Sequence, residues 1–303
     1  AVQAQPELGR VVTIKPEWTG AEGSSLYLSA GEQITMEALL YGLLLHSGND
    51  AALAVAGFCG GDTETFVGWM NDKAVALGME HTHFTNPSGL NEAGHYSSAA
   101  DMALLARAVL ASEPLARIVS TRTITIGGRS LTNHNRLLWR YEGCTGMKTG
   151  YTTEAKYCLS GTACRDGMTL IAVVLGGESS DERFATAKQM LDYGFANYRI
   201  VTPEKLDVEP IRVERGISDF SELEYDSFSL LLEKGKEAKI EQRITLEPSL
   251  QAPVAKGDVA GYVEFYVDGE LQTKVPVRVT EDNGEIGFSD IFSRVLKKLL
   301  AFA

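Results

Sequence analysis

Two glycines stand shortly before a Lys-Thr-Gly triplet, and this stretch restricts the fold more than any other. Gly143 and Gly146 precede Lys148-Thr149-Gly150, so several backbone positions around the polar residues have no side chain. Glycine weakens a strand and often marks a place where another backbone or a ligand comes close. We therefore expect Lys148 and Thr149 on or beside a strand, facing a cleft. A glycine-rich loop with a solvated lysine is the alternative.

The residues after the triplet have the pattern of a hairpin. Two strand-like runs, 157–163 and 169–175, are joined at Arg165-Asp166-Gly167. A short polar link that ends in Asp-Gly is a strong signal for a tight turn between antiparallel strands. This part of the chain is therefore predicted to form a mainly antiparallel sheet.

A second polar motif, Ser47-Gly48-Asn49, lies between apolar helical stretches at residues 36–44 and 51–56. Serine and asparagine favour helix ends, so capping of the two helices is one explanation of the motif. Catalysis is the other. We favour catalysis because Ser-x-Asn followed later by Lys-Thr-Gly is two thirds of a known signature, whose first element is Ser-x-x-Lys.

The chain resembles the D-alanyl-D-alanine carboxypeptidases, the low-molecular-mass penicillin-binding proteins. Beyond the two motifs, the segments 23–52, 84–107 and 133–152 look like family segments in family order. The resemblance extends over residues 11–198 and, more loosely, over the rest. It implies an α/β fold, in which a penicillin-binding-protein/β-lactamase-like domain has an antiparallel sheet flanked by helices.

The first element of the signature is absent, because no serine in the chain is followed three residues later by lysine. In the family, Ser-x-x-Lys would fall just before Ala1. We therefore expect the nucleophile and its lysine in a segment outside this chain, which by itself is expected to be inactive. That segment could be a separate piece of a nicked protein. No signal peptide is visible, which agrees with a chain whose beginning has been lost.

The sequence pattern changes after residue 198, where short β-like runs replace the helical spacing of apolar residues. Asp268-Gly269 between two such runs is a strong hairpin signal. We expect three parts: residues 1–200 as the catalytic domain, 201–285 as a small β-sandwich-like domain that serves as a spacer or interaction module, and 286–303 as an amphipathic helix. Apolar residues of this tail recur at helical spacing opposite a basic face, which suits a membrane interface. A helix docked on its own domain is the alternative.

The family model implies a serine acyl transfer that removes the last residue of peptides ending in D-Ala-D-Ala. Ser47 would relay a proton to the leaving amine, and Asn49 would orient the lysine and the substrate amide. Lys148 would raise the local positive potential. The backbone N–H of Tyr151 would contribute to the oxyanion hole.

The terminal carboxylate of the substrate would be bound at Thr149 and Gly150 and by Arg183. Arg183 falls in the first turn of a predicted helix that begins near Ser180, where the helix dipole prefers an anion. A negatively charged ligand would resolve that mismatch. An ion pair with Glu182 or Asp181 on the surface is the rival explanation.

The remaining observations narrow the function. A net charge of −12 argues against a nucleic-acid partner. The four cysteines have no CxxC spacing and are expected to be mostly buried small hydrophobic residues, which leaves their redox state open. His81 and His83 have no third ligand nearby, so neither a metal nor an organic cofactor is implied. His95 and His134 could in principle serve a Ser-His-Asp triad, but the chain has no GxSxG elbow.

The implied partners are peptidoglycan stem peptides, β-lactams as inhibitors and a membrane surface. The implied setting is the outer face of the bacterial cytoplasmic membrane, with roles in cell-wall biosynthesis and cell shape. Two rivals remain, namely a non-catalytic binder that has lost its nucleophile and a serine β-lactamase. One departure from the family pattern is Lys156, which stands where glycine is usual and could crowd the strand or be harmless at an edge.

Overall fold

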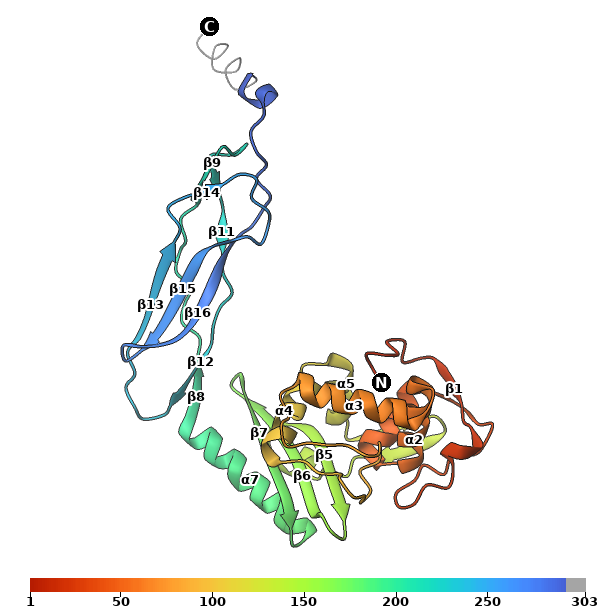
Figure 1. Cartoon of the computed structure of the whole chain (residues 1–303). Coiled ribbons are helices and arrows are strands. Elements are labelled where there is room, and N and C mark those ends of the chain that lie inside the picture. The colour runs from red at the N-terminus through yellow and green to blue at the C-terminus, as the bar shows by residue number, and fades with distance from the viewer. Residues whose placement is uncertain (293–303) are drawn as a thin grey trace. The chain divides into compact units, whose positions relative to one another are not determined.

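The computed structural model describes residues 1–292, which form parts of two compact units, Ala1–Ala196 and Asn197–Ala303 (Figure 1). Residues 288–292 are helical, but most of the amphipathic helix expected at 286–303 lies outside the described residues. Within the described part of the chain, no helix is long and apolar enough to span a bilayer.

A three-stranded antiparallel sheet forms the centre of the first unit. Its strands are β5 (Cys144–Thr152), β6 (Lys156–Arg165) and β7 (Met168–Gly177), hydrogen-bonded in that order. Asp166 and Gly167 both have positive φ, 48° and 76°, as the tight turn between β6 and β7 requires. The predicted hairpin is confirmed, and the Lys-Thr-Gly triplet lies on β5.

Helices cover both faces of this sheet. On one face, Met147 of β5 packs with Ala106 of α4 (Ala99–Leu110) and Val119 of α5 (Glu113–Ser120), and Ile171 joins them. Leu170, the preceding residue of β7, approaches Gly194 of α7 (Ser180–Asn197). Because neighbouring strand residues point to opposite faces, α7 lies on the other side of the sheet.

A second apolar core of the first unit is built around two consecutive helices. The paired strands β1 (Val11–Thr13) and β2 (Gln33–Thr35) lead into α1 (Met36–Tyr41), where the Thr35 side chain accepts from the N–H of Ala38 at 3.2 Å. The chain continues through the π-helical turn η2 (Gly42–His46) into α2 (Asn49–Gly60). The remaining elements of the unit are η1 (Pro16–Trp18), α3 (Thr63–Ala76), β3 (Thr123–Ile126), β4 (Arg129–Thr132) and α6 (Leu137–Arg140).

In the second unit every described element before residue 288 is a strand. Its main sheet has the order β11 (Leu223–Glu224), β16 (Glu270–Val279), β15 (Val259–Val267) and β13 (Ile240–Leu246). The buried core of the sheet is formed by Tyr225, Val263, Phe265 and Val277. The predicted turn at Asp268-Gly269 joins β15 and β16. The other strands are β8 (Tyr198–Val201), β9 (Ile211–Glu214), β10 (Phe220–Ser221), β12 (Leu230–Glu233) and β14 (Leu250–Gln251).

Two helical glycines provide a matched test of this packing. A Cβ atom at Gly57 of α2 would lie 2.3 Å from Nε1 of the buried Trp18, whereas one at the exposed Gly68 of α3 would meet nothing within 4 Å. We expect Gly57→Ala to lower the free energy of unfolding by about 1–3 kcal/mol through overpacking. Gly68→Ala is expected to raise it by about 0.5–1 kcal/mol, because alanine loses less conformational entropy in a helix. Urea denaturation of both variants checks this, and equal effects would contradict the packing described here.

Candidate active site

Ser47 is held in an unusual backbone conformation between two helices. It ends the turn η2 with φ 65° and ψ 35°, in the left-handed region, and α2 begins at Asn49. The N-cap of α2 is Gly48, which has no side chain to donate or accept. Ser47 is thus the C-cap residue of η2, but its side chain does not cap α2, and its hydroxyl is available for another partner.

That partner is Lys148, which is 101 residues away in sequence. Its Nζ donates to Ser47 Oγ at 2.9 Å and to the carbonyl oxygen of Thr149 at 2.9 Å. Desolvation, and then the charge of Arg183, lower the pKa of Lys148 from 10.5 to about 8. The ammonium is therefore still protonated near neutral pH, but its proton is held much less tightly than in water.

Asn49 is buried beside Ser47, and both its backbone and its side chain are hydrogen-bonded. Its N–H donates to the carbonyl oxygen of Ser24 at 2.8 Å, and its Nδ2 donates to that of Glu22 at 2.6 Å. Ser24 and Gly23 line the same cleft as Asn49. The preceding segment and the start of α2 therefore form one wall of the site.

Arg183 lies in the first turn of α7 but points to the sheet, not to the surface acids. One Nη donates to the carbonyl oxygens of Gly150 and Cys158, at 2.9 and 3.2 Å. Asp181 instead pairs with Arg136 at 2.9 Å. The surface ion pair with Asp181 is thus replaced by two backbone acceptors. Arg183 Nε is buried without a hydrogen-bond partner among the described residues.

These groups converge on a cleft of about 730 Å³. The described residues that line it include no aspartate and no glutamate, whereas Lys148, Arg183 and Arg136 supply positive charge. An anionic ligand would therefore gain electrostatic stabilisation here without meeting an acidic side chain. The full lining is Gly23, Ser24, Ser47, Asn49, Ser88, Gly89, Leu90, Asn133, His134, Arg136, Lys148, Thr149, Gly150, Tyr151, Thr152 and Arg183.

All the residues predicted from the sequence lie in this cleft, although they come from different elements. Ser47 and Asn49 flank the start of α2, Arg183 comes from α7, and the other four belong to β5: Lys148, Thr149, Gly150 and Tyr151. The Tyr151 side chain is 59% exposed and lies over Tyr157, with ring centroids 4.6 Å apart. Its backbone N–H is the group to which an oxyanion role was assigned.

Sequence reasoning missed the part played by the Asn133-His134-Asn135 segment. His134 lines the cleft, its N–H donates to the Leu45 carbonyl oxygen at 3.2 Å, and its ring lies 5.2 Å from that of His46. Burial, followed by the charges of Lys148, His46 and Arg183, lowers the pKa of His134. The flanking asparagines, both buried, were the available signal, because buried amides need fixed hydrogen-bond partners.

The other histidines singled out in the sequence do not line the cleft. His95 Nδ1 lies 3.2 Å from the Thr85 hydroxyl, and His83 Nδ1 lies 2.9 Å from the Gly94 carbonyl oxygen. No group of three potential metal ligands occurs in the part of the chain that the structure describes. Lys156 adopts φ 55°, a conformation that favours glycine, but its ammonium reaches Glu178 at 2.5 Å. Its side chain is exposed and does not crowd the strand.

Comparison with known proteins agrees with this geometry. A family model described as D-alanyl-D-alanine carboxypeptidase matches residues 9–179, more than half of the chain. A second model, described as the C-terminal domain of penicillin-binding protein 5, matches residues 211–285.

Individual relatives extend over most of both chains. The D-alanyl-D-alanine carboxypeptidase DacF of Bacillus subtilis is 38% identical, and the aligned region covers 90% of this chain and 73% of DacF. DacC of Escherichia coli is 35% identical, and the aligned region covers 90% of this chain and 69% of DacC. The crystal structure of penicillin-binding protein 5 from Haemophilus influenzae superposes with a TM-score of 0.77 at 31% identity, over 94% of this chain and 86% of that one. The chain therefore belongs to the D-alanyl-D-alanine carboxypeptidases, the serine-type hydrolases known as low-molecular-mass penicillin-binding proteins.

Proposed function

We propose that this chain builds the substrate cleft of a carboxypeptidase that trims the terminal D-alanine from peptidoglycan stem peptides. The observation that carries the proposal is the contact between Lys148 Nζ and Ser47 Oγ at 2.9 Å. It joins the second and third signature motifs in a cleft whose described lining has no acidic side chain. A peptide that ends in a free carboxylate has the charge that this cleft favours.

The reaction is an acyl transfer with two steps. A serine oxygen attacks the carbonyl carbon between the two D-alanines, the C–N bond breaks, and the terminal D-alanine leaves with a proton on its nitrogen. Water then attacks the acyl-enzyme and releases the shortened peptide. Ser47 is suited to deliver the proton to the leaving nitrogen. Because its oxygen accepts from Lys148, its own hydrogen is free to point into the cleft.

The other cleft groups bind and polarise the substrate. The Thr149 side chain and the charge of Arg183 favour the terminal carboxylate, while Arg183 also holds β5 and β6 through the Gly150 and Cys158 carbonyl oxygens. Asn49 orients the substrate amide. The N–H of Tyr151 donates to the oxyanion, and removal of one such donor typically slows acyl transfer about a hundredfold to a thousandfold.

The nucleophile is proposed to come from a segment outside these 303 residues, because no serine here has a lysine three residues later. The β unit, assigned to residues 201–285, is proposed to act as a spacer or interaction module. Residues 286–303 are proposed to lie in a membrane interface, since their apolar residues recur in the sequence at helical spacing and Arg294, Lys297 and Lys298 would share the opposite face. Stem peptides are exposed outside the cytoplasmic membrane, so the proposed site of action is its outer face, in cell-wall maturation and the control of cell shape.

Fluorescent penicillin tests the origin of the nucleophile. The product of the complete reading frame is expected to form a covalent adduct, which peptide mapping places on the serine of a Ser-x-x-Lys motif. The 303-residue chain alone is expected to form none. An adduct on Ser47 would overturn the roles assigned here. A complete protein that never forms an adduct would instead be a non-catalytic binder.

The proton-relay role of Ser47 predicts a kinetic defect. In the complete enzyme, Ser47→Ala is expected to lower kcat/KM for release of D-alanine by about a hundredfold to ten-thousandfold, the usual range for general acid–base catalysis. Ser130→Ala is the control, since that serine is exposed on β4 and bonds to Thr125, away from the cleft. A loss in the control as large as that in Ser47→Ala would contradict a specific role.

The lowered pKa of Lys148 predicts a pH dependence of substrate binding. Below about 8 the amine holds its proton and attracts the substrate carboxylate, and above about 8 it loses both proton and charge. KM for an anionic dipeptide is therefore expected to rise as the pH increases through that value. In Lys148→Arg the guanidinium stays charged, so the rise should vanish even if kcat falls. An identical KM profile in both proteins would show that Lys148 does not set the binding of the anion.

A further inference from the structure

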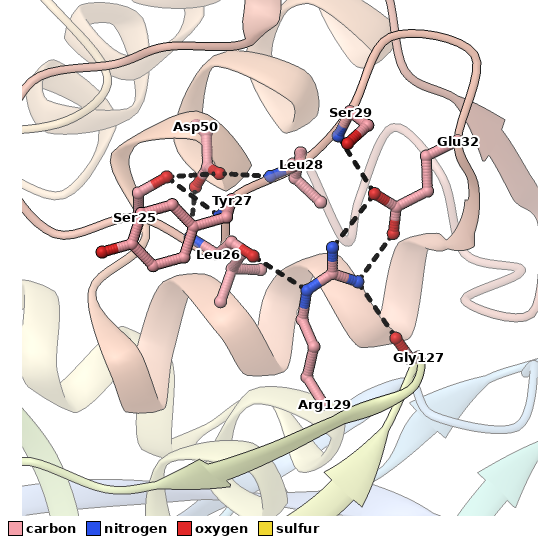
Figure 2. A network of polar contacts seen from close by, with 9 residues as sticks. All are labelled: Ser25, Leu26, Tyr27, Leu28, Ser29, Glu32, Asp50, Gly127 and Arg129. Carbon is pink, nitrogen blue, oxygen red and sulfur yellow. Dashed lines mark hydrogen bonds and ion pairs between the residues drawn. The ribbon is translucent and has the colours of Figure 1, made fainter.

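One wall of the cleft is a segment without helix or strand, residues 22–28. Gly23 and Ser24 of this segment line the cleft, and Leu26 lies against the turn that carries Ser47. Irregular segments of this kind keep a fixed shape only when other groups satisfy their backbone hydrogen bonds. Figure 2 shows where those groups come from: the carboxylate of Asp50 on one side and the guanidinium of Arg129 on the other.

Asp50 is completely buried and binds the segment through three hydrogen bonds. Its carboxylate accepts from the Ser25 hydroxyl at 2.7 Å, the Leu26 N–H at 2.9 Å and the Leu28 N–H at 3.0 Å. The N–H of Ala51, next to it on α2, supplies a fourth at 2.9 Å. Burial alone would raise the pKa of this carboxyl group, but the four donors outweigh burial and lower it. An ionised carboxylate, which only accepts, is the group that suits four converging donors.

Arg129, from the start of β4, holds the same segment from its other side. Its Nε donates to the Leu26 carbonyl oxygen at 2.9 Å, and its two Nη atoms bind both oxygens of Glu32 at 2.6 and 3.0 Å. The N–H of Leu26 is bound by Asp50 and its C=O by Arg129. The position of this one residue is therefore determined in two directions (Figure 2).

Leu26 in turn packs against the turn that carries Ser47. A Cβ atom at Gly42 would lie 2.1 Å from Leu26 Cδ1, and one at Gly48 would lie 2.9 Å from Leu26 Cγ. Gly42 begins η2 and Gly48 directly follows Ser47, whose left-handed conformation persists only when its surroundings hold it. Asn49 is attached to the same segment by its two hydrogen bonds to backbone carbonyl oxygens.

We propose that Asp50, supported by Arg129, is a positioning residue for the carboxypeptidase reaction. It holds segment 22–28 against the turn that carries Ser47. Ser47 Oγ therefore remains within hydrogen-bond distance of Lys148 Nζ, and Asn49 remains in the wall of the cleft. Asp50 does not line the cleft and acts only through these neighbours. The inference rests on the proposed function, since it assumes the roles given to Ser47, Asn49 and Lys148.

The test uses Asp50→Asn, which keeps the shape of the side chain but presents an N–H₂ group to donors. The variant is made in the 303-residue chain with 15N-labelled lysines, and the titration of Lys148 is followed by NMR and assigned with Lys148→Arg. We expect the pKa of Lys148 to move from about 8 towards 10.5, because a loosened wall lets water reach the ammonium. Arg129→Lys should shift it in the same direction by less.

The matched control is Arg117→Lys, which alters a more exposed arginine–glutamate pair, with Glu37 at 2.8 Å. It should leave the titration of Lys148 unchanged, even if it lowers the melting temperature. A folded Asp50→Asn protein in which Lys148 titrates as in the wild type would overturn the proposal. If Asp50→Asn does not fold, Arg129→Lys decides in the same way.

In the complete enzyme, Asp50→Asn is also expected to lower kcat/KM, since misplacement of a reacting group by about 1 Å can cost about a hundredfold in rate. The two proposals can fail separately. The proposed function would be refuted if the pKa of Lys148 is lowered in the wild-type chain but the complete protein neither hydrolyses the substrate nor is labelled by penicillin. Loss of activity in Asp50→Asn with an unchanged Lys148 would refute the positioning role.

Discussion

The groups of the cleft are arranged around the ammonium of Lys148, which is partly buried and pairs with no carboxylate among the described residues. A desolvated cation needs acceptors, and Lys148 finds the Ser47 hydroxyl and the Thr149 carbonyl oxygen. Both are neutral, so the charge is solvated but not cancelled, and the pKa of Lys148 falls to about 8. A substrate carboxylate would supply the missing negative charge. The same contact also joins the helical part of the first unit to its sheet, since Ser47 follows η2 and Lys148 belongs to β5.

Buried polar side chains hold the backbone around the cleft. Asp50 and Arg129 do not line the cleft, whereas Asn133 does. Asp50 and Arg129 bind the backbone of Leu26, and Leu26 packs against Gly42 at the start of η2 and Gly48 after Ser47. Asn133 likewise holds the backbone that carries His134, because its amide donates to the carbonyl oxygens of Val119 and Thr121 at 3.1 Å. In both places a buried polar side chain replaces regular secondary structure as the source of rigidity.

Of the two possibilities that the glycines before Lys148 left open, close approach of the protein itself applies to Gly143 and Gly146. A side chain at Gly143 would lie 2.4 Å from the Cys164 carbonyl oxygen, and one at Gly146 would lie 2.9 Å from Val119 Cγ2. These two positions allow close packing within the protein. Gly150 is the one that faces the cleft, and its carbonyl oxygen serves Arg183. A glycine pattern thus indicates close approach, but the sequence does not say whether protein or ligand approaches.

Local features could be predicted from the sequence alone. The turns at Asp166-Gly167 and Asp268-Gly269, the sheet that contains Lys148 and the change to an all-β unit follow from short-range backbone preferences and from hydrophobic period. The motifs, through their resemblance to a family, also indicated which side chains belong together. Only the tertiary structure decided how they meet. Ser47 accepts a hydrogen bond from Lys148, Arg183 donates to backbone carbonyl oxygens, and Asp50 accepts from the segment 22–28 that forms one wall of the cleft. Those contacts join residues that are from 22 to 101 positions apart, and no local preference determines them because they form only when the cores are packed.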